Sequence, residues 1–372
     1  MSYKIFIILF LAVFTLSSAA EIFAQTSVST NSSQWMKLKT EPFRGKQDDV
    51  FFVTPEIGWY VNGAGKIYKT IDGGANWTLK LNKPGTYFRA VGFVDEQRGF
   101  AGNIGTEYYP NVSDTTPLYE TGDGGETWKA VAGVDERMIK GICAIEIVKK
   151  PFINAGKLDY KTTIYAGGRV GSPARLLKSE DGGATWQSID MSRYCQMILD
   201  VKFFDEKNGV ISAGSDGNVQ KSNALILTTT DGGKTWVNRY QSKRPYEITW
   251  KSSFPTRRVG YITIQNYNPD KNVTERVLAK TTDGGKSWKE INLVNDFNVR
   301  EFGIGFVDEK RGWVGTTTGG YETLDGGMTW KPVEMGKAVN KIRILKTENG
   351  FVNYAIGLDL YKINILENRK KR

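Results

Sequence analysis

Aspartate residues recur in one fixed setting in this chain, which raises the question of whether they do chemistry. The pattern Ser/Thr-x-Asp-Gly-Gly-x-x-Trp occurs six times in 372 residues. Its aspartates are Asp72, Asp123, Asp181, Asp231, Asp283 and Asp325, and its tryptophans are Trp77, Trp128, Trp186, Trp236, Trp288 and Trp330. A fixed carboxylate can act as a general acid or base. It can also accept hydrogen bonds within its own turn, where glycines supply positive φ. We interpret all six as structural turns, because the same glycines and tryptophan accompany each one.

The residue types present restrict other catalytic chemistry. The chain has no histidine, which excludes Ser–His and Cys–His catalysis and histidine-ligated metal sites. No glycine-rich phosphate-binding motif precedes a predicted helix. We therefore expect no cofactor and no metal.

Glycoside hydrolysis is the enzymatic alternative that stays open. A sialidase needs three arginines around a carboxylate, a tyrosine nucleophile, a glutamate that activates it, and an aspartic acid. Residues of these types include Arg89, Arg193, Arg300, Tyr246 and Glu247. The Arg-Ile-Pro start of sialidases is missing, and EPFRG at 41–45 is the nearest stretch. Glu247, Glu301 and Asp200 are candidate acids for a two-carboxylate hydrolase, but their spacing supports no pair. We expect a protein that is not an enzyme.

The spacing of the motif indicates which elements carry it. Successive aspartates lie 51, 58, 50, 52 and 42 residues apart, and a period near 50 is typical of four-stranded propeller blades. A second pattern places an apolar residue six positions before a glycine, as in FVDEQRG at 93–99 and FVDEKRG at 306–312. It predicts an inner strand, a tight turn and a second strand. The third blade has no clean copy, and 142–152 stands in its place.

The two ends of the chain account for a blade without the motif. WMKL at 35–38 has the form of an outer strand, and GLDLYKIN at 357–364 resembles the strand before an aspartate turn. We predict that the C-terminal segment supplies three strands of a seventh blade and the N-terminal segment the fourth. Closing the ring in this way removes exposed sheet edges. The expected fold is an all-β, seven-bladed β-propeller with six Asp-box turns, forming one domain over residues 25–366.

The combination of Gly-Trp or Gly-Phe second strands with Asp-Gly-Gly-x-Thr-Trp turns resembles the photosystem II stability/assembly factor family. This resemblance covers essentially the whole chain after the first 24 residues. It implies an exported seven-bladed propeller of the Asp-box type, also known as the bacterial neuraminidase repeat. It further implies a non-catalytic factor that binds a membrane-protein partner through an arginine-rich surface. The same turn occurs in sialidases, xyloglucanases and sortilin-type receptors, so it predicts architecture better than activity.

Strand direction predicts which face of the ring binds. Strands alternate in direction, so the Asp-box turns lie on the face opposite the loops that enter the inner strands. That opposite face also carries the longest predicted loops, at 103–117, 214–223 and 265–276, and loops on a rigid scaffold often carry function. We predict a partner-binding basic face there, formed by Arg89, Arg137, Arg193, Arg239, Arg244 and Arg300 with Tyr108 and Tyr109. Guanidinium groups suit carboxylates, phosphates and polar protein loops.

The termini and the overall charge indicate the compartment. Residues 1–24 read as a signal peptide, cleaved after Ala20 or Ala24, so we expect a periplasmic or extracellular protein. Residues 367–372 form a basic tail that we expect to be solvated. The formal net charge is +10, but export argues against nucleic acid as a partner. Cys143 and Cys195 leave a disulfide open.

The predicted function is therefore an exported, non-catalytic binding or assembly factor that engages a protein partner. An exposed loop of a membrane protein is one candidate partner, a glycan is another ligand to consider, and we expect a monomer. A cell-surface adhesion or scaffold protein would leave the same sequence traces and stays an alternative.

Overall fold

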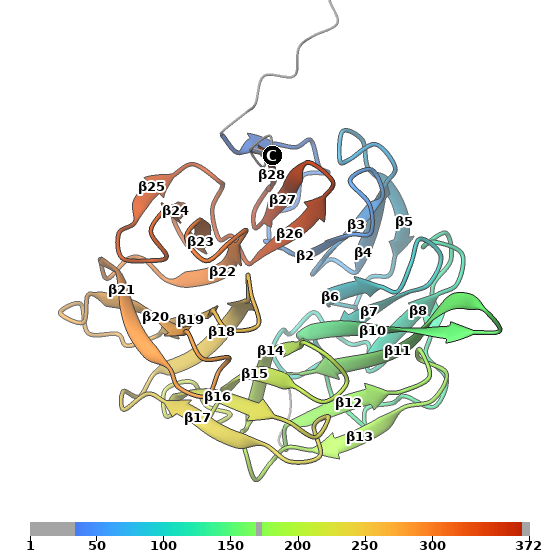
Figure 1. Ribbon diagram of the computed structural model, residues 1–372, viewed down its shortest axis with the longest axis horizontal. Coiled ribbons are helices and arrows are strands. Elements are labelled where there is room, and N and C mark those ends of the chain that lie inside the picture. The colour runs from blue at the N-terminus through green and yellow to red at the C-terminus, as the bar shows by residue number, and fades with distance from the viewer. Residues whose placement is uncertain (1–33, 169–172, 367–372) are drawn as a thin grey trace, which may run out of the picture.

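The computed structural model describes residues 34–168 and 173–366. Twenty-eight strands form seven antiparallel four-stranded sheets, which are arranged around a central axis like the blades of a propeller (Figure 1). The expected all-β, seven-bladed architecture is confirmed. The described residues include no helix long and apolar enough to cross a membrane. The predicted signal peptide and basic tail lie outside the described residues.

Strands A to D of each blade run from the axis outwards. Blade one contains β2 (Gln47–Phe52), β3 (Gly58–Asn62), β4 (Lys66–Thr70) and β5 (Thr78–Asn82). Blade two contains β6 (Phe88–Phe93), β7 (Gly99–Asn103), β8 (Leu118–Thr121) and β9 (Lys129–Ala130). Blade three contains β10 (Ala144–Asn154), β11 (Lys157–Gly167), β12 (Arg175–Ser179) and β13 (Gln187–Asp190). Blade four contains β14 (Met197–Phe203), β15 (Gly209–Gly214), β16 (Ala224–Thr229) and β17 (Val237–Gln241).

The remaining blades follow the same order. Blade five contains β18 (Glu247–Ser253), β19 (Gly260–Asn266), β20 (Glu275–Thr281) and β21 (Lys289–Asn295). Blade six contains β22 (Glu301–Phe306), β23 (Gly312–Thr316), β24 (Gly320–Thr323) and β25 (Lys331–Val333). Blade seven contains β26 (Lys341–Thr347), β27 (Gly350–Ile356), β28 (Leu360–Leu366) and, on its outer edge, β1 (Met36–Lys37).

Blade seven closes the ring with strands from both ends of the chain, as predicted. Met36 pairs with Lys362 and Lys37 with Tyr361, and the Leu38 N–H donates to the Leu360 carbonyl at 2.8 Å. The buried Trp35 ring packs edge-on against Trp313 of blade six, with ring centroids 5.6 Å apart. The N-terminal strand therefore adds both backbone pairing and apolar burial to the last blade.

Stacked aromatic rings explain the second sequence pattern. The phenylalanine that ends an inner strand stacks on the aromatic residue that follows the glycine in the preceding blade. Trp59 and Phe93 stack with ring centroids 3.4 Å apart, and Tyr261 and Phe306 at 3.7 Å. The Asp-box tryptophan of the same blade meets that phenylalanine edge-on, as Trp330 meets Phe306. The glycine is required because a side chain there would collide with the ring: a Cβ at position 99 would lie 2.5 Å from Phe93.

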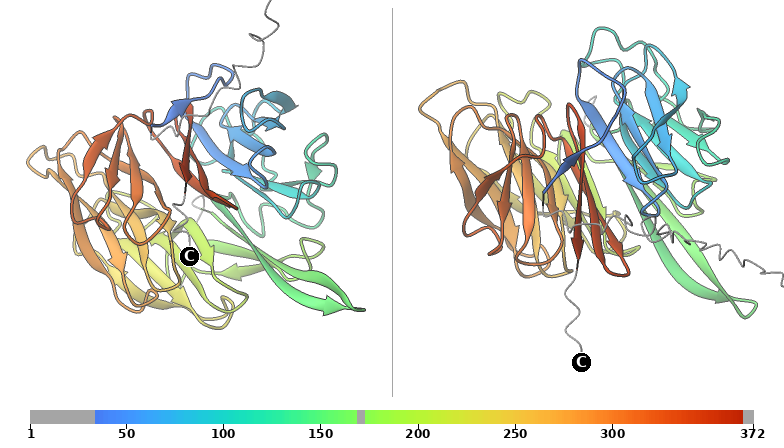
Figure 2. Two further views of the ribbon diagram at one scale, coloured as in Figure 1. Left: turned by 45° about the horizontal axis from the view of Figure 1, so that its top comes forward. Right: turned by 90° about the horizontal axis from the view of Figure 1, so that it is seen from above.

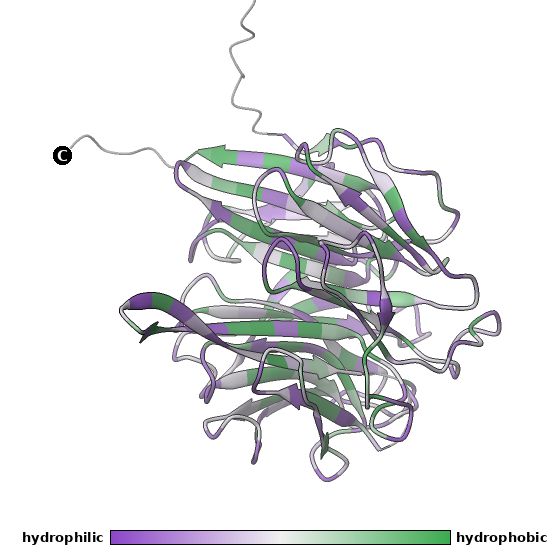
Figure 3. Ribbon diagram, turned by 90° about the vertical axis from the view of Figure 1, so that its right-hand side faces the viewer, coloured by the Kyte–Doolittle hydropathy of each residue, from purple (hydrophilic) through white to green (hydrophobic). Residues whose placement is uncertain are grey.

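Blade three departs from the regular pattern by its length. β10 and β11 contain eleven residues each, and their far halves project from the ring as a two-stranded hairpin (Figures 2 and 3). We term residues 149–162 the arm. It lies on the Asp-box side of the ring, since the Gly182 N–H of the blade-three Asp-box turn donates to the Thr162 carbonyl at 2.9 Å. The sequence predicts that the longest segments between the core strands of a blade lie on the face opposite the Asp boxes. For blade three this prediction is wrong.

Candidate binding face

Each Asp-box aspartate has its oxygens occupied by its own turn. In blade four, Asp231 accepts hydrogen bonds from the Thr235 N–H at 2.9 Å and the Thr235 hydroxyl at 2.6 Å. The Thr229 hydroxyl donates to the same carboxylate at 2.8 Å. Gly232 and Gly233 have φ values of 76° and 88°, which favours glycine. Partial burial acts to raise the pKa of Asp231, but these hydrogen bonds hold it at about 2.

The other five boxes repeat this arrangement. Asp72, Asp123, Asp181, Asp283 and Asp325 accept the backbone N–H of Asn76, Thr127, Thr185, Ser287 and Thr329, respectively. A carboxylate whose oxygens are already engaged and whose pKa is low is a poor general acid. The geometry therefore supports the structural interpretation of all six.

The two faces of the ring can be assigned from backbone hydrogen bonds. Asp-box turns bond to the A–B turns of their own blades: the Gly73 N–H donates to the Glu56 carbonyl at 2.8 Å, and Gly326 to Lys310 at 2.8 Å. D–A loops bond instead to B–C loops, as the Thr317 N–H donates to the Arg300 carbonyl at 3.0 Å. The D–A loops and the long B–C loops thus share the face opposite the Asp boxes.

Four of the six predicted arginines lie on consecutive D–A loops of that face. Arg137 follows blade two, Arg193 follows blade three, Arg244 follows blade four and Arg300 follows blade five. We term this set the arginine arc. Its members differ in whether a carboxylate of the protein already pairs with the guanidinium. That difference decides which of them can bind a ligand.

Arg193 and Arg300 keep their charge available. The Arg193 guanidinium lies 4.7 Å from the centroid of the Tyr194 ring, and Arg300 lies 4.2 Å from that of Tyr267. Neither forms an ion pair with any residue in the described ranges. The Arg300 Nε–H is buried and donates to no described group. Each guanidinium therefore lies over an aromatic ring; Arg193 also donates to the Tyr194 hydroxyl, and both keep further donors for a ligand.

Arg137 and Arg244 are already paired with carboxylates. Arg137 is exposed and bonds to Asp135 of its own loop. Arg244 is held between Glu247 at 2.6 Å and Glu290 at 2.9 Å. Arg244 therefore serves the structure of blade five, whereas Arg137 could exchange its exposed partner for a ligand.

The other two predicted arginines do not join the arc. The Arg89 side chain is buried, with the residue 3% exposed. Its guanidinium pairs with Asp48 at 2.6 Å and faces the Trp250 ring at 5.1 Å. Arg239 lies on the outer strand β17, lines a 350 Å³ groove with the Asp283 box turn, and bonds to Thr228. The prediction that both lie on the basic face is wrong.

The predicted tyrosines stand beside the arc on the long loop of blade two. Tyr108 and Tyr109 are exposed, and Tyr109 stacks on Tyr87 with centroids 4.6 Å apart. Arg137 lines a neighbouring 490 Å³ depression with Glu107 and other residues of blades two and three. Aromatic and arginine side chains on one rim are typical of protein interfaces.

A buried polar network fills the axis of the ring, and sequence reasoning missed it. The Lys251 ammonium donates to the Leu199 carbonyl at 2.7 Å and lies 3.6 Å from Asp200. Lys341 of blade seven reaches the same Asp200 at 3.1 Å. Contacts between such distant blades are made across the axis. The only signal in the sequence was a charged residue within the otherwise apolar inner strands β14 and β18, where the register shifts.

The three carboxylates considered for a hydrolase are all buried. Asp200 belongs to the axial network; burial acts to raise its pKa, but Lys341 and Lys251 hold it at about 2. Glu247 is bonded to Arg244 and, at 3.0 Å, to Asn266. Burial raises the pKa of Glu301 well above its usual range, and its carboxylate oxygens have no hydrogen-bond partner among the described residues. The structure does not present these acids as a pair in an open cleft.

The cysteines and the acidic side chains form neither a disulfide nor a metal site among the described residues. Cys143 and Cys195 are both free and buried, so the structure contains no bond between them, and burial raises the pKa of the Cys195 thiol to about 12. Within residues 34–168 and 173–366, no three His, Cys, Asp or Glu side chains gather as a metal site.

Comparisons with known proteins place this geometry among propellers. No family model matches the chain. One curated relative, an oligoxyloglucan-reducing end-specific xyloglucanase of Emericella nidulans, is 22% identical over 205 residues. That match covers 46% of this chain and 24% of the relative, so the chain spans about a quarter of its length.

Two solved structures align over most of the chain. The structure of YCF48 bound to D1 peptide has a TM-score of 0.60 at 16% identity, covering 90% of this chain and 96% of that one. YCF48 from Cyanidioschyzon merolae has a TM-score of 0.61 at 15% identity, covering 89% and 99%. Such identities show the fold alone: this chain is a β-propeller similar in structure to YCF48, and the predicted architecture is confirmed.

Proposed function

We propose that this protein is an exported, non-catalytic binding or assembly factor that holds a polypeptide segment of a partner protein on its arginine arc. The proposal rests on the surroundings of the Arg193 and Arg300 guanidinium groups. Both lie on D–A loops opposite the Asp boxes, both are stacked on tyrosines, and neither is neutralised by a described carboxylate. Stacking fixes a guanidinium in advance, so less conformational entropy is lost when a carboxylate or carbonyl binds it.

The likeness to YCF48 supports a polypeptide as the ligand. One of the similar structures is described as YCF48 bound to D1 peptide, so a propeller of this shape can bind a peptide. By that analogy, the partner of this chain is a protein segment with exposed carboxylates or carbonyls. A loop or tail of a membrane protein exposed outside the cytoplasm would meet an exported propeller.

The proposal is tested by chemical cross-linking and mass spectrometry with the purified protein and membrane and exported fractions of its source. We expect wild type to capture a defined partner, with cross-links near the arc. The double variant Arg193→Glu and Arg300→Glu should lose that partner without a change in melting temperature. The control is Arg257→Glu with Lys310→Glu, which makes the same charge change on exposed A–B turns. Equal capture by both double variants would refute the proposal.

Glycoside hydrolysis is the second candidate, favoured only by the partial match to a xyloglucanase. A panel of fluorogenic glycosides tests it directly. Turnover that disappears in Glu247→Gln and persists in Arg193→Glu would favour the enzyme over the binding factor.

A further inference from the structure

The arm has one open edge, which can be identified from its turn. Ala155 and Gly156 form a two-residue hairpin turn with φ values of 48° and 78°, and Asn154 pairs with Lys157 beside it. Hydrogen-bonded and non-hydrogen-bonded pairs alternate from that closing pair. Phe152 with Asp159 is therefore a hydrogen-bonded pair. The backbone groups of Leu158, Tyr160 and Thr162 consequently point away from β10.

Two contacts agree with this assignment. The outward Thr162 carbonyl accepts the Gly182 N–H at 2.9 Å. The Tyr160 N–H donates at 2.7 Å to the carboxylate of its neighbour Asp159, not to the opposite strand. β12 pairs with β11 only from Ile164 to Gly167. The rest of β11 has a strand on one side only among the residues that the structure describes.

The other edge of the arm is blocked. Pro151 of β10 stands opposite Tyr160, so its nitrogen faces outward and carries no hydrogen to donate. Proline and lysine are devices by which proteins protect exposed strand edges. Their placement here protects β10 and leaves β11 available.

The arm exposes several large apolar side chains to solvent. Ile153 is 70% exposed, Leu158 61% and Tyr160 45%. In an antiparallel pair, residues directly opposite each other share a face, so Ile153 and Leu158 lie together, followed by Pro151 and Tyr160. A contiguous exposed apolar strip beside an open strand edge marks an interaction site.

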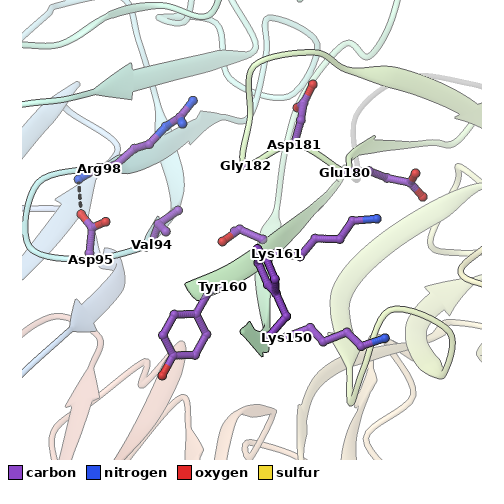
Figure 4. A pocket seen from close by; sticks show the side chains of 11 residues that line it. Val94, Asp95, Arg98, Lys150, Tyr160, Lys161, Glu180, Asp181 and Gly182 are labelled. Atoms are coloured by element: carbon purple, nitrogen blue, oxygen red, sulfur yellow. Dashed lines mark hydrogen bonds between the residues drawn. The ribbon is translucent and has the colours of Figure 1, made fainter. Parts of the chain in front are cut away.

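A pocket lies at the base of this edge. It has a volume of about 610 Å³ and is lined by residues of the arm, the A–B turn of blade two and the blade-three Asp box. In Figure 4, Arg98 and Asp181 lie on one side of the pocket and Tyr160 and Lys161 of the arm on the other, with the Lys161 side chain directed towards Glu180. This volume is within the range of ligand pockets. It can receive a side chain from a strand laid along β11.

The charges around the edge favour an acidic occupant. The arm carries Lys149, Lys150, Lys157 and Lys161 against the single acid Asp159. Lys157 and Lys161, with Arg98 on the pocket wall, form no ion pair with a residue in the described part of the chain. Each of the three acids that line the pocket has a partner: Asp181 is bonded within its box, Asp95 accepts the Arg98 N–H, and Glu180 pairs with Lys178. A second copy of this chain would bring the same positive charge to the edge.

We propose that the open edge of β11 binds an extended, acidic polypeptide segment as an added strand, with an apolar side chain of that segment in the pocket between the arm and blade two. The backbone of the added strand bonds to Leu158 and Tyr160 and displaces the Asp159 carboxylate from the Tyr160 N–H. Strand addition of this kind supplies affinity through the main chain and specificity through alternate side chains. The surface lies opposite the arginine arc, so this site is separate from the proposed function.

The probe for the test is a fluorescein-labelled peptide in which glutamate alternates with valine and phenylalanine, measured by fluorescence anisotropy. Its control is the same peptide with lysine in place of glutamate, which should not bind. Leu158→Pro removes an outward N–H from the open edge. Ile153→Pro is the matched control, because Ile153 lies opposite Leu158 and its N–H faces the edge that Pro151 already blocks.

We expect Leu158→Pro to weaken binding about tenfold or more and Ile153→Pro to change it little, since only the first removes a main-chain contact. Hydrogen exchange on wild type supplies a second readout: the peptide should slow exchange at Leu158 and Tyr160. The proposal is overturned if both prolines weaken binding equally, if the lysine peptide binds as well, or if exchange at these amides is unchanged. Dimerisation of wild type that Leu158→Pro abolishes would show that a second copy occupies the edge, and would also overturn it.

Discussion

At the scale of single residues, charged side chains divide into those whose partners are internal and those whose charge faces solvent. Asp231 and Arg244 look reactive in the sequence, but hydrogen bonds and ion pairs within the fold occupy them. Arg193 and Arg300 look the same in the sequence, yet aromatic rings hold them and no described carboxylate neutralises them. Residue type alone therefore does not identify a binding residue.

The structural role of the Asp box can be tested in blade four. Asp231→Ala removes an acceptor for Thr229 and Thr235 and should cost about 1–2 kcal/mol in the free energy of unfolding. Trp236→Ala removes a ring packed against Phe203 and should cost about 3–5 kcal/mol. Urea denaturation measures both. A well-folded Asp231→Ala variant that has lost partner capture would contradict a purely structural role.

Glu301 should make stability depend on pH. Burial raises the pKa of its carboxyl well above 4.5, its ordinary value, so the folded protein keeps a proton that the unfolded chain releases. The free energy of unfolding must then fall as pH rises above the unfolded pKa. Glu301→Gln removes this cost, so it should raise the melting temperature at about pH 8 more than at about pH 4. An equal effect at both pH values would show that Glu301 is ionised in the folded state.

At the scale of elements, the sequence predicted the repeated blade and the closure of blade seven, but it missed the arm and misplaced Arg89. The stacking of Phe93 on Trp59 recurs in other blades, so its spacing was visible before any coordinates. Among the described residues, the two strands of the arm pair only with each other. No other blade, as far as the structure describes the chain, has such an extension, so no repeat in the sequence indicates it. Arg89 was misplaced because the register of β6 shifts beside it, between Phe88 and Ala90. That shift turns its side chain to the axis, and the charge within an apolar strand is the one feature of the sequence that accompanies it.

Closure of blade seven is the element-scale feature with the clearest energetic test. Trp35 is buried against Trp313 of the neighbouring blade, so Trp35→Ala should cost about 3–5 kcal/mol through lost burial and a cavity. Met36, the next residue and the first of β1, is exposed, and Met36→Ala should change stability little. Urea denaturation measures both variants, and Met36→Ala is the control in which backbone pairing and Trp35 packing are both kept. Equal stability of Trp35→Ala and wild type would mean that packing of Trp35 is not needed to close the ring.

At the scale of the whole molecule, the ring separates two surfaces of different chemistry. The arginine arc faces one way on the D–A loops, whereas the arm projects on the Asp-box side (Figure 2). Between them stand the inner strands and the axial network of Asp200, Lys251 and Lys341. A closed ring of packed sheets leaves little freedom for one face to move relative to the other. Ligands at the two proposed sites should therefore not compete with each other.

This separation predicts that binding at the two faces is independent. Arg193→Glu with Arg300→Glu should abolish partner capture at the arc and leave anisotropy of the acidic peptide at the arm unchanged. Leu158→Pro should weaken binding of the acidic peptide and leave partner capture unchanged, because it alters only the open edge of β11. A saturating concentration of the acidic peptide should not displace the captured partner from wild type. Cross-linking in the presence of the peptide measures this. If the peptide releases the partner, or if either variant loses both activities while its melting temperature is unchanged, the two ligands share one site and the assignment of separate faces is wrong.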